Sequence, residues 1–373
     1  MKKMLFVGVV ILLLSALVFG CGPAEPTTPT TPTTPTTPTE VKPIKLSMSY
    51  GYPSVGMLAD QYRELGRRIE EATEGRYQIE YYWGGSLCSA MEQLAGCRDG
   101  ICDITTGGGA YTPAIMPLTA ALEFPYNCPD LWASAKAQTE LELTYEPLIQ
   151  EYEDTNIKWY GPYGTGTFSF VTAEPDWTLE KMKGKVVRCF GAQHNNWMEK
   201  VGIEPVMFSI FDCYEALERG TIWGFTNTLT LADDLRHYEV AKSLVVVYHG
   251  TCMCPSQAIN LDVFNSMSKK DQEALIATGI DWGENYQAKE LIEAENRVID
   301  HFAEEGVNVI YPTAAEDKFL KDCAAESSLE YMIDKDAALG SDSTAFQDML
   351  TLVEEFRDKY MKELEEKGYP WER

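Results

Sequence analysis

Residues 183–227 read KGKVVRCFGAQHNNWMEKVGIEPVMFSIFDCYEALERGTIWGFTN and alternate between strand-forming and helix-forming segments. This pattern predicts a strand, a helix, a short strand, a second helix and a last strand that ends near Asn227. The first strand ends at Arg188. Ligands of open α/β sheets bind outside the carboxyl ends of the strands. We therefore expect Arg188 to hold a ligand carboxylate, with Asn227 beside it.

Strand-like and helix-like segments alternate along most of the remaining chain, which is typical of the α/β class with a largely parallel sheet. From Ser268 to Glu305 the sequence predicts almost continuous helix, with a break allowed at Gly279. A further helix is expected over residues 130–151. Strands are predicted at residues 44–50, 77–83, 101–106, 157–160, 167–172, 243–248, 257–260 and 307–311.

Length and charge limit the possible functions. The 373 residues exceed what one core usually holds, so two lobes or domains are expected. The formal net charge of −26 argues against nucleic acid or an anionic membrane surface as a partner. A small anion remains compatible with this charge, because one buried arginine can outweigh a distant, screened surface.

The N-terminus predicts export. Residues 1–20 combine two lysines with a long apolar run, as in a signal peptide. Val18-Phe19-Gly20-Cys21 resembles a bacterial lipobox, which makes Cys21 the predicted lipidation site. Residues 21–43 contain TTP repeats and predict an extended tether. We expect an extracytoplasmic protein that is lipid-anchored to the cell membrane, in the periplasm or on the outer face; an uncleaved membrane anchor is the alternative.

Nine cysteines remain besides Cys21, and an odd number cannot pair completely within one chain. No CxxC pair occurs, so the sequence does not predict a structural zinc site. Three interpretations stay open: buried small hydrophobic residues, one or two disulfides, or a metal or redox centre. We expect no cofactor and no metal.

An ordered set of motifs over residues 45–340 resembles the DctP-type solute-binding proteins of TRAP transporters. The motifs include Gly84-Gly85-Ser86-Leu87, the segments 100–105 and 183–188, the segment 202–206, Tyr214 to Gly220, and Tyr238 to Lys242. The resemblance implies a two-lobed periplasmic-binding-protein (Venus flytrap) fold with a long helix crossing both lobes. It places lobe I at residues 44–165 plus about 253–292, and lobe II at 166–252 plus about 293–373.

The same resemblance implies a non-catalytic protein that binds an organic acid and delivers it to the membrane subunits of a TRAP permease. Arg188 matches the arginine of the family that pairs with a substrate carboxylate. Asn227 and His249 match an asparagine and a histidine of the family pocket. For His249, a structural role and a role in catalysis or metal binding also remain open.

The sequence departs from the family pattern at several positions. Trp223-Gly224-Phe225-Thr226-Asn227 stands where the family usually has Asp-Gly-Gln-Glu-Asn, and Ile210-Phe211-Asp212 stands where Phe-Ser-Glu is common. These changes remove polar groups and add aromatic surface. We therefore expect a relatively apolar or aromatic monocarboxylate as the ligand. The aromatic residues expected to contact it are Tyr52, Tyr111, Phe168, Phe211, Trp223 and Phe225.

Two other classes of function remain as alternatives. One is an exported thiol- or metal-dependent enzyme on the same scaffold, although the sequence contains no GxSxG motif and no recognisable flanking motif of a catalytic cysteine. The other is the binding component of an ABC importer or of a sensor.

Overall fold

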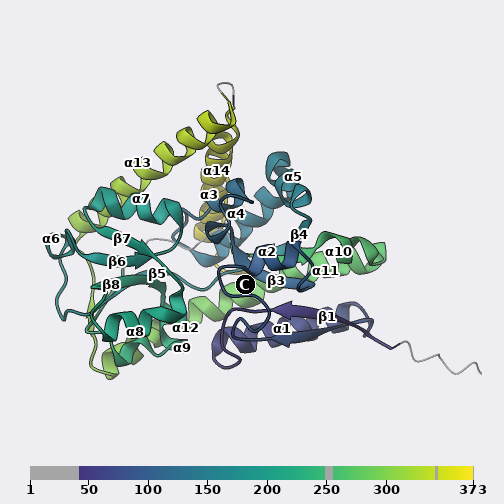
Figure 1. The fold of residues 1–373 in the computed structure, drawn as a ribbon, viewed down its shortest axis with the longest axis horizontal. Coiled ribbons are helices and arrows are strands. Elements are labelled where there is room, and N and C mark those ends of the chain that lie inside the picture. The colour runs from purple at the N-terminus through teal and green to yellow at the C-terminus, as the bar shows by residue number, and fades with distance from the viewer. Residues whose placement is uncertain (1–41, 248–254, 341–342, 373) are drawn as a thin grey trace, which may run out of the picture. The chain divides into compact units, whose positions relative to one another are not determined.

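The computed structural model describes residues 42–247, 255–340 and 343–372. It contains two β-sheets with helices packed around them (Figure 1). The predicted α/β class is confirmed, and the pair of sheets forms a two-lobed fold. The predicted export signal, Cys21, all but the last two residues of the Thr/Pro-rich tether, and His249 lie outside the described residues.

The first lobe is built on a five-stranded sheet with the strand order β2-β1-β3-β10-β4. Strands β2 and β3 both pair parallel with β1, whereas β10 pairs antiparallel with β3 and β4. The strands are β1 (Ile44–Ser49), β2 (Tyr77–Tyr82), β3 (Ile104–Gly108), β4 (Ile157–Pro162) and β10 (Pro255–Asn260).

The second lobe is built on a six-stranded sheet with the order β11-β9-β5-β8-β6-β7. Here β5 pairs antiparallel with β8 and β9, and the other pairs are parallel. The strands are β5 (Phe168–Thr172), β6 (Val186–Cys189), β7 (Glu204–Met207), β8 (Gly224–Thr228), β9 (Ser243–Val245) and β11 (Asn308–Ile310).

Each sheet is thus largely parallel, as predicted, with one reversed strand. In the order of the described elements, β5 follows β4 and β10 follows β9, so each reversed strand comes directly after a strand of the other sheet. A parallel pair within one sheet needs a crossover connection, which is usually helical. The sequence pattern gave no sign of this reversal, because both directions bury the same apolar residues.

The stretch 183–227 forms the predicted succession of elements. Helix α7 (Gly191–Val201) connects β6 to β7, and α8 (Cys213–Glu218) connects β7 to β8. Helix α7 ends at Gly202, which has φ +92° and takes the left-handed conformation that glycine favours at this position. The predicted helix 130–151 is in fact two helices, α4 (Leu131–Thr144) and α5 (Glu146–Asp154). Pro147 lies in the first turn of α5, where its missing N–H is tolerated.

One long helical segment crosses both lobes, as predicted. It consists of α11 (Lys269–Asp281), a π-helical turn (Trp282–Gln287) and α12 (Ala288–Glu304). Helix α11 packs on β4 in the first lobe, and α12 packs on α9 (Leu229–Asp234) in the second. The sequence allows a break at Gly279, but α11 continues through this residue to Asp281. A side chain at Gly279 would collide with the carbonyl of Tyr160, so this glycine lets the helix approach β4 closely.

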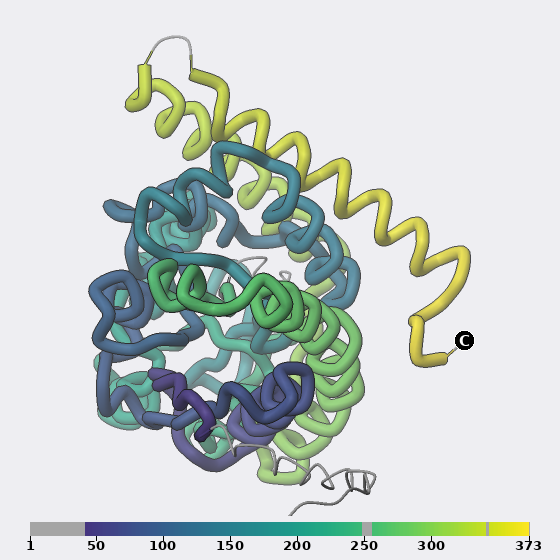
Figure 2. Tube along the Cα trace, turned by 90° about the vertical axis from the view of Figure 1, so that its right-hand side faces the viewer, coloured from purple at the N-terminus to yellow at the C-terminus, as the bar shows by residue number. Residues whose placement is uncertain are grey.

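The C-terminal helices α13 (Ala314–Leu339) and α14 (Ala345–Lys367) pack against each other, at the yellow end of the colour scale in Figure 2. Helix α13 also packs on α7 of the second lobe, and α14 packs on α4. The remaining helices are α1 (Met57–Ala72), α2 (Gln93–Arg98), α3 (Pro117–Ala121), α6 (Leu179–Met182) and α10 (Leu261–Ser266). Short 3₁₀ turns lie at Gly109–Tyr111, Ile210–Asp212, His237–Glu239 and Pro370–Glu372.

Candidate ligand-binding site

A cavity of about 80 Å³ lies where strand ends of the two sheets face each other. The first lobe contributes residues that follow β1, β3 and β4, and the second contributes residues at the ends of β6 and β8 and at the start of β5. The lining side chains and glycines are Gly51, Tyr52, Ala90, Gln93, Thr106, Gly107, Gly108, Tyr111, Glu123, Tyr163, Thr165, Phe168, Arg188, Phe190, Ile210, Phe211, Asn227 and Leu231.

Arg188 is the cation of this cavity, and it is only 2% exposed. Its Nε donates to the carbonyl of Phe208 at 2.9 Å, and another guanidinium nitrogen donates to the carbonyl of Thr226 at 3.4 Å. Among the described residues, no carboxylate lies within ion-pair distance of it. A buried charge that lacks a counter-charge is unfavourable by several kcal/mol. Arg188 is therefore positioned to receive an anion.

Tyr111 joins the two lobes at Arg188. Its hydroxyl, on the 3₁₀ turn after β3, accepts a hydrogen bond from the guanidinium at 3.2 Å. Burial raises the pKa of Tyr111, and the nearby guanidinium only partly opposes this shift. The hydroxyl thus keeps its proton near neutral pH, and this proton is available to an acceptor in the cavity.

Asn227 is held by a histidine that the sequence analysis did not select. The Asn227 amide nitrogen lies 3.3 Å from Nδ1 of His237, and its Oδ1 accepts from the backbone N–H of Thr228 at 2.9 Å. Burial, followed by the charge of Arg188, lowers the pKa of His237 to about 3. The neutral ring accepts the amide proton at Nδ1 and fixes the amide, so the second amide hydrogen of Asn227 remains for another acceptor.

Aromatic rings form the apolar part of the lining. Phe168 stacks on Phe190 with ring centroids 4.7 Å apart, and Tyr52 meets Phe211 edge-on at 5.6 Å. Phe168, Phe211 and Tyr52 were predicted as aromatic residues of the site. Phe190 was not, although it stands two residues after Arg188, where the β6 strand turns into α7.

Two of the predicted aromatic residues do not line the cavity. Phe225 is the second residue of β8 and is fully buried, and its ring centroid lies 4.7 Å from that of His237. Trp223 precedes β8 and therefore lies at the opposite end of that strand, near the amine of Lys185. Depth along a strand, rather than aromatic character, excludes both from the cavity.

Glu123 also lines the cavity and was not predicted. It is 4% exposed, and its Oε1 accepts from the backbone N–H of Ala110 at 2.8 Å. Burial raises the pKa of this carboxyl to about 7, against the opposing effect of that hydrogen bond. The available signal was an acidic residue inside the apolar run Ala120-Ala121-Leu122-Glu123-Phe124.

Further contacts hold the two lobes together around the cavity. The carboxylate of Asp234, at the end of α9, accepts from the backbone N–H groups of Met57 at 3.0 Å and Leu58 at 3.3 Å, where α1 begins. The side chain of Gln193 on α7 donates to the carbonyl of Ala121. These bonds connect segments of different lobes, so the structure represents the closed arrangement.

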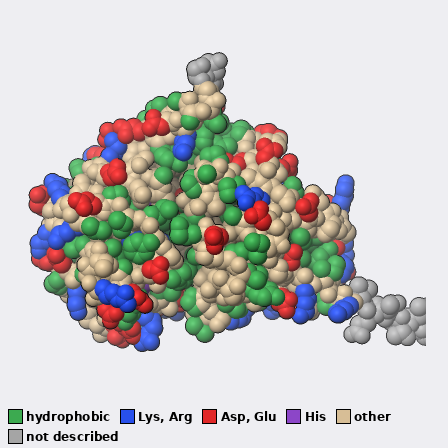
Figure 3. Space-filling view, in the orientation of Figure 1, with side chains coloured by type: hydrophobic (Ala, Val, Ile, Leu, Met, Phe, Trp, Pro, Cys, Tyr) green, Lys and Arg blue, Asp and Glu red, His purple; other side chains and the backbone are tan. Residues whose placement is uncertain are grey.

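A larger groove of about 1040 Å³ lies elsewhere, bordered by residues of α13 and α14, by residues 124–129 and by Val246. Its ionisable side chains, among them Lys321, Glu354 and Arg357, include both signs of charge. Acidic and basic side chains are likewise interspersed around the margin of the face shown in Figure 3. We place the site in the smaller cavity, because only there does a buried cation lack a partner among the described residues.

Six of the seven described thiols show no sign of activation. The exception is Cys102, whose pKa is lowered chiefly by a hydrogen bond from the Cys97 thiol, but this residue is only 1% exposed. Seven cysteines, Cys88, Cys97, Cys102, Cys128, Cys189, Cys213 and Cys323, are buried and unpaired within the described chain, whereas Cys252 and Cys254 lie outside it. Burial raises the pKa of Cys189 and Cys213 to about 12, although Arg188 opposes this shift. A reactive cysteine needs a lowered pKa. In the described part of the chain, no three His, Cys, Asp or Glu side chains are grouped so that they could hold a metal ion.

Hydropathy gives a separate finding about the helices. Over residues 42–247, 255–340 and 343–372, no helix has the length and apolar composition needed to cross a membrane.

Comparison with known proteins gives consistent results. The family model of the bacterial extracellular solute-binding proteins, family 7 (DctP), matches residues 54–335. The 2,3-diketo-L-gulonate-binding periplasmic protein YiaO of Escherichia coli is 25% identical over 304 residues, which cover 79% of this chain and 89% of that protein.

Solved structures show the same fold. A TRAP periplasmic solute-binding protein from Desulfovibrio salexigens with bound orotic acid is 18% identical, with a TM-score of 0.74 over 85% of this chain and 99% of that one. A marine metagenome TRAP solute-binding protein specific for aromatic acids, solved with 3-hydroxybenzoate, is 16% identical with the same TM-score and the same coverage.

Proposed function

Because the chain belongs to the DctP family of bacterial extracellular solute-binding proteins, family 7, we propose that it captures a small organic acid and delivers it to a TRAP permease. Arg188 pairs with the carboxylate of this acid. The observation that carries the proposal is a guanidinium that is 2% exposed and has no carboxylate partner among the described residues. Family membership also favours a receptor over an exported enzyme.

The geometry leaves room for a carboxylate at Arg188. A guanidinium has five N–H donors, and Arg188 makes three hydrogen bonds to the protein, to Phe208, Thr226 and Tyr111. Two donors therefore remain for the ligand, and a carboxylate can accept both in a forked contact. The free amide hydrogen of Asn227 and the hydroxyl proton of Tyr111 provide further donors on the same side.

The shape of the cavity favours a compact acid with a flat or ring-shaped body. About 80 Å³ is too little for a long chain, and the stacked rings of Phe168 and Phe190 form one apolar wall. Phe211 and Tyr52 add a second apolar wall. These apolar walls agree with the expectation of a relatively apolar or aromatic monocarboxylate.

Closure of the lobes brings the ligand out of water. Tyr111, which lines the cavity, and Asp234 make their inter-lobe bonds only when the lobes meet. In an open form, Arg188 would be hydrated and accessible. An anion that binds Arg188 replaces this water and thereby stabilises the closed form.

We further propose that the protein is exported and anchored at the membrane through a lipid on Cys21, with residues 22–43 as a tether. The lipobox-like segment and the TTP repeats support this. Cys21→Ser is expected to release the protein from the membrane fraction of the producing cells. Retention of the variant in that fraction would instead support the alternative of an uncleaved membrane anchor, while leaving the binding proposal intact.

Binding itself is tested by a thermal-shift and calorimetric screen of mono- and dicarboxylates against the wild type and Arg188→Met. We expect a subset of acids to stabilise the wild type and to lose about 100-fold in affinity on Arg188→Met, which corresponds to one lost charge-assisted contact of about 3 kcal/mol. Arg219→Met is the matched control, since Arg219 pairs with Glu215 on the surface with 69% of its side chain exposed.

Circular dichroism of Arg188→Met establishes that the variant is folded before affinities are compared. The proposal is wrong if acids that bind the wild type bind folded Arg188→Met equally well.

A further inference from the structure

The cavity contains one positive and one negative side chain. Of the described residues that line it, only Arg188 and Glu123 are charged in their usual ionised forms, and they are 2% and 4% exposed. They come from different lobes: Arg188 is the last residue but one of β6, and Glu123 follows α3. Among the described residues no ion pair joins them, nor does one connect Glu123 to any other cation.

Glu123 has one fixed hydrogen bond and one oxygen available. Its Oε1 accepts from Ala110 at 2.8 Å, and no protein donor reaches Oε2 among the hydrogen bonds of the described residues. A carboxylate can accept about four hydrogen bonds. Gly108 leaves the space that the group needs, because a Cβ at this position would lie 2.6 Å from Oε1. The carboxyl is thus packed in place with unused capacity on the cavity side.

Charge balance then restricts the ligand. With Arg188 and Glu123 both ionised, the empty cavity is neutral. A simple monocarboxylate bound to Arg188 would place a second carboxylate in the same cavity as Glu123, where like charges repel strongly, so it could bind only as Glu123 took up a proton. A ligand that also brings a nitrogen donor avoids this, since the donor satisfies Glu123 while the carboxylate satisfies Arg188.

We propose that Glu123 is a second ligand-anchoring residue, and that the ligand is a compact carboxylic acid that also carries an N–H donor, as in an amino acid, an imino acid or a lactam acid. This inference rests on the proposed function, because Arg188 must first hold the carboxylate. The ligand is therefore bipolar, with its carboxylate toward the second lobe, its nitrogen toward the first and its carbon skeleton against the aromatic walls.

Ring acids of equal size provide the test. L-Proline carries a charged nitrogen donor, L-pyroglutamate carries a neutral one, and cyclopentanecarboxylate and tetrahydrofuran-2-carboxylate carry none. Calorimetry at pH 7.5 would compare the four acids on the wild type, Glu123→Gln and Glu142→Gln. Glu142 is a suitable control because its carboxyl is also 4% exposed but bonds Tyr152 outside the cavity.

We expect at least one nitrogen acid to bind the wild type and Glu142→Gln about tenfold or more tightly than the two ring acids without nitrogen. Glu123→Gln is expected to remove most of this preference while the acids without nitrogen bind it no more weakly than before. Proline and pyroglutamate together distinguish a charged from a neutral donor.

Two results would overturn the inference in different ways. If all four acids bind through Arg188 and none is preferred, or if the preference survives Glu123→Gln, the role of Glu123 is wrong but the carboxylate proposal stands. If the wild type and Arg188→Met do not differ toward any acid in the wider screen, the proposed function fails and this inference fails with it.

Discussion

The guanidinium of Arg188 and the hydroxyl of Tyr111 lie 3.2 Å apart, although they belong to different lobes. Arg188 is thereby both the proposed anion-binding group and a contact between the two lobes. Because the hydroxyl accepts from Arg188, its own proton points to another acceptor, and a bound carboxylate can occupy that place. We therefore expect ligand binding and lobe closure to be coupled through the hydroxyl oxygen of Tyr111.

Tyr111→Phe is expected to weaken acid binding about tenfold, because it removes a hydrogen bond to a charged group worth about 1.5 kcal/mol. The loss should appear mainly as faster dissociation, since the bond forms on closure. Stopped-flow or surface-plasmon-resonance measurements would determine the association and dissociation rates separately. Tyr311→Phe is the control, because the Tyr311 ring is 60% exposed and lies outside the cavity. Equal dissociation rates in Tyr111→Phe and the wild type would contradict the coupling.

Glu123 is expected to make the ligand-free protein less stable as pH rises. The ordinary pKa of its carboxyl is 4.5 and burial raises it to about 7, so the folded state binds this proton more tightly than the unfolded state. The resulting stabilisation is present below pH 4.5 and is lost as pH rises to about 7. The difference of about 2.5 units corresponds to at most about 3 kcal/mol.

Urea unfolding of ligand-free wild type and Glu123→Gln at pH 5 and pH 8 measures this effect. Glutamine removes the buried charge, so the variant should gain stability relative to the wild type at pH 8 but much less at pH 5. Glu218 is exposed on α8, so Glu218→Gln should have the same stability as the wild type at both pH values. If the free energies of unfolding of wild type and Glu123→Gln change equally between pH 5 and pH 8, the Glu123 carboxyl is not buried in the folded protein.

The order of elements was predictable from the sequence where local signals are strong. In residues 183–227, alternating apolar strands and glycine helix ends such as Gly202 predict each element correctly. The sequence also placed Arg188 and Asn227 at strand ends, and the structure brings both to one cavity. Parallel strands place their carboxyl ends along one edge of a sheet, so this juxtaposition follows from strand order alone.

The errors and omissions in the predicted site concern how deeply each side chain lies in the folded protein. Phe225 and Asn227 lie on the same strand two residues apart, and only the latter reaches the cavity. Glu123 lies in an apolar run, and no local pattern shows that its carboxyl lines the same cavity as Arg188. His237 acts through Asn227, which only the fold reveals. Such relationships require the packing of distant segments.

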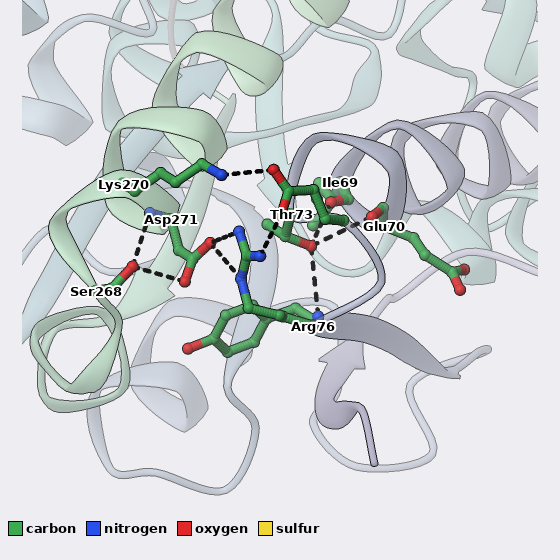
Figure 4. Close-up of polar contacts among 9 residues, drawn as sticks. Ile69, Glu70, Thr73, Arg76, Ser268, Lys270 and Asp271 are labelled. Atoms are coloured by element: carbon green, nitrogen blue, oxygen red, sulfur yellow. Dashed lines mark hydrogen bonds and ion pairs between the residues drawn. The ribbon is translucent and has the colours of Figure 1, made fainter. Parts of the chain in front are cut away.

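Arg76 is expected to stabilise the first lobe by linking α1 to the long helix. Its guanidinium donates to Oδ1 of Asp271 at 3.0 and 2.6 Å, and Figure 4 shows the contact between the turn after α1 and the first turn of α11. Ser268 donates to the other carboxylate oxygen. The Asp271 side chain is 5% exposed and that of Arg76 is 32% exposed, so the pair lies between a surface and a buried ion pair.

Arg76→Ala should lower the free energy of unfolding at pH 7 by about 1–2 kcal/mol, between the ranges for exposed and buried pairs. The hydrogen bonds from Arg76 lower the pKa of Asp271 below its ordinary 3.8, so their contribution is present above that pH and is lost as pH falls through the folded-state pKa. The deficit of the variant should therefore shrink in acid. Arg98→Ala, whose partner Asp99 is exposed, should change stability by less than about 1 kcal/mol.

Gly191 is expected to permit closure, and Gly191→Ala should hold the lobes apart. Gly191 begins α7 in the second lobe with φ +76°, and a Cβ there would lie 2.6 Å from the Cβ of Ala110 in the first lobe. Carbon atoms cannot approach this closely, so an alanine must push the lobes apart. We expect acid affinity to fall about tenfold or more, since less of the closed form is populated.

The Gly202→Ala variant separates the effect of backbone strain from the effect of the contact between residue 191 and Ala110. Gly202 also has a positive φ, +92°, but a Cβ there would meet only the flexible Lys183 side chain, at 3.4 Å. Both variants should lose roughly 1–2 kcal/mol of stability from the left-handed conformation, whereas only Gly191→Ala should lose affinity and show a larger radius of gyration by X-ray scattering with the acid present. Adding Ala110→Gly removes the opposing methyl group and should restore part of the affinity. If Gly191→Ala and Gly202→Ala bind acids equally well, close contact between Gly191 and Ala110 is not required for the bound state.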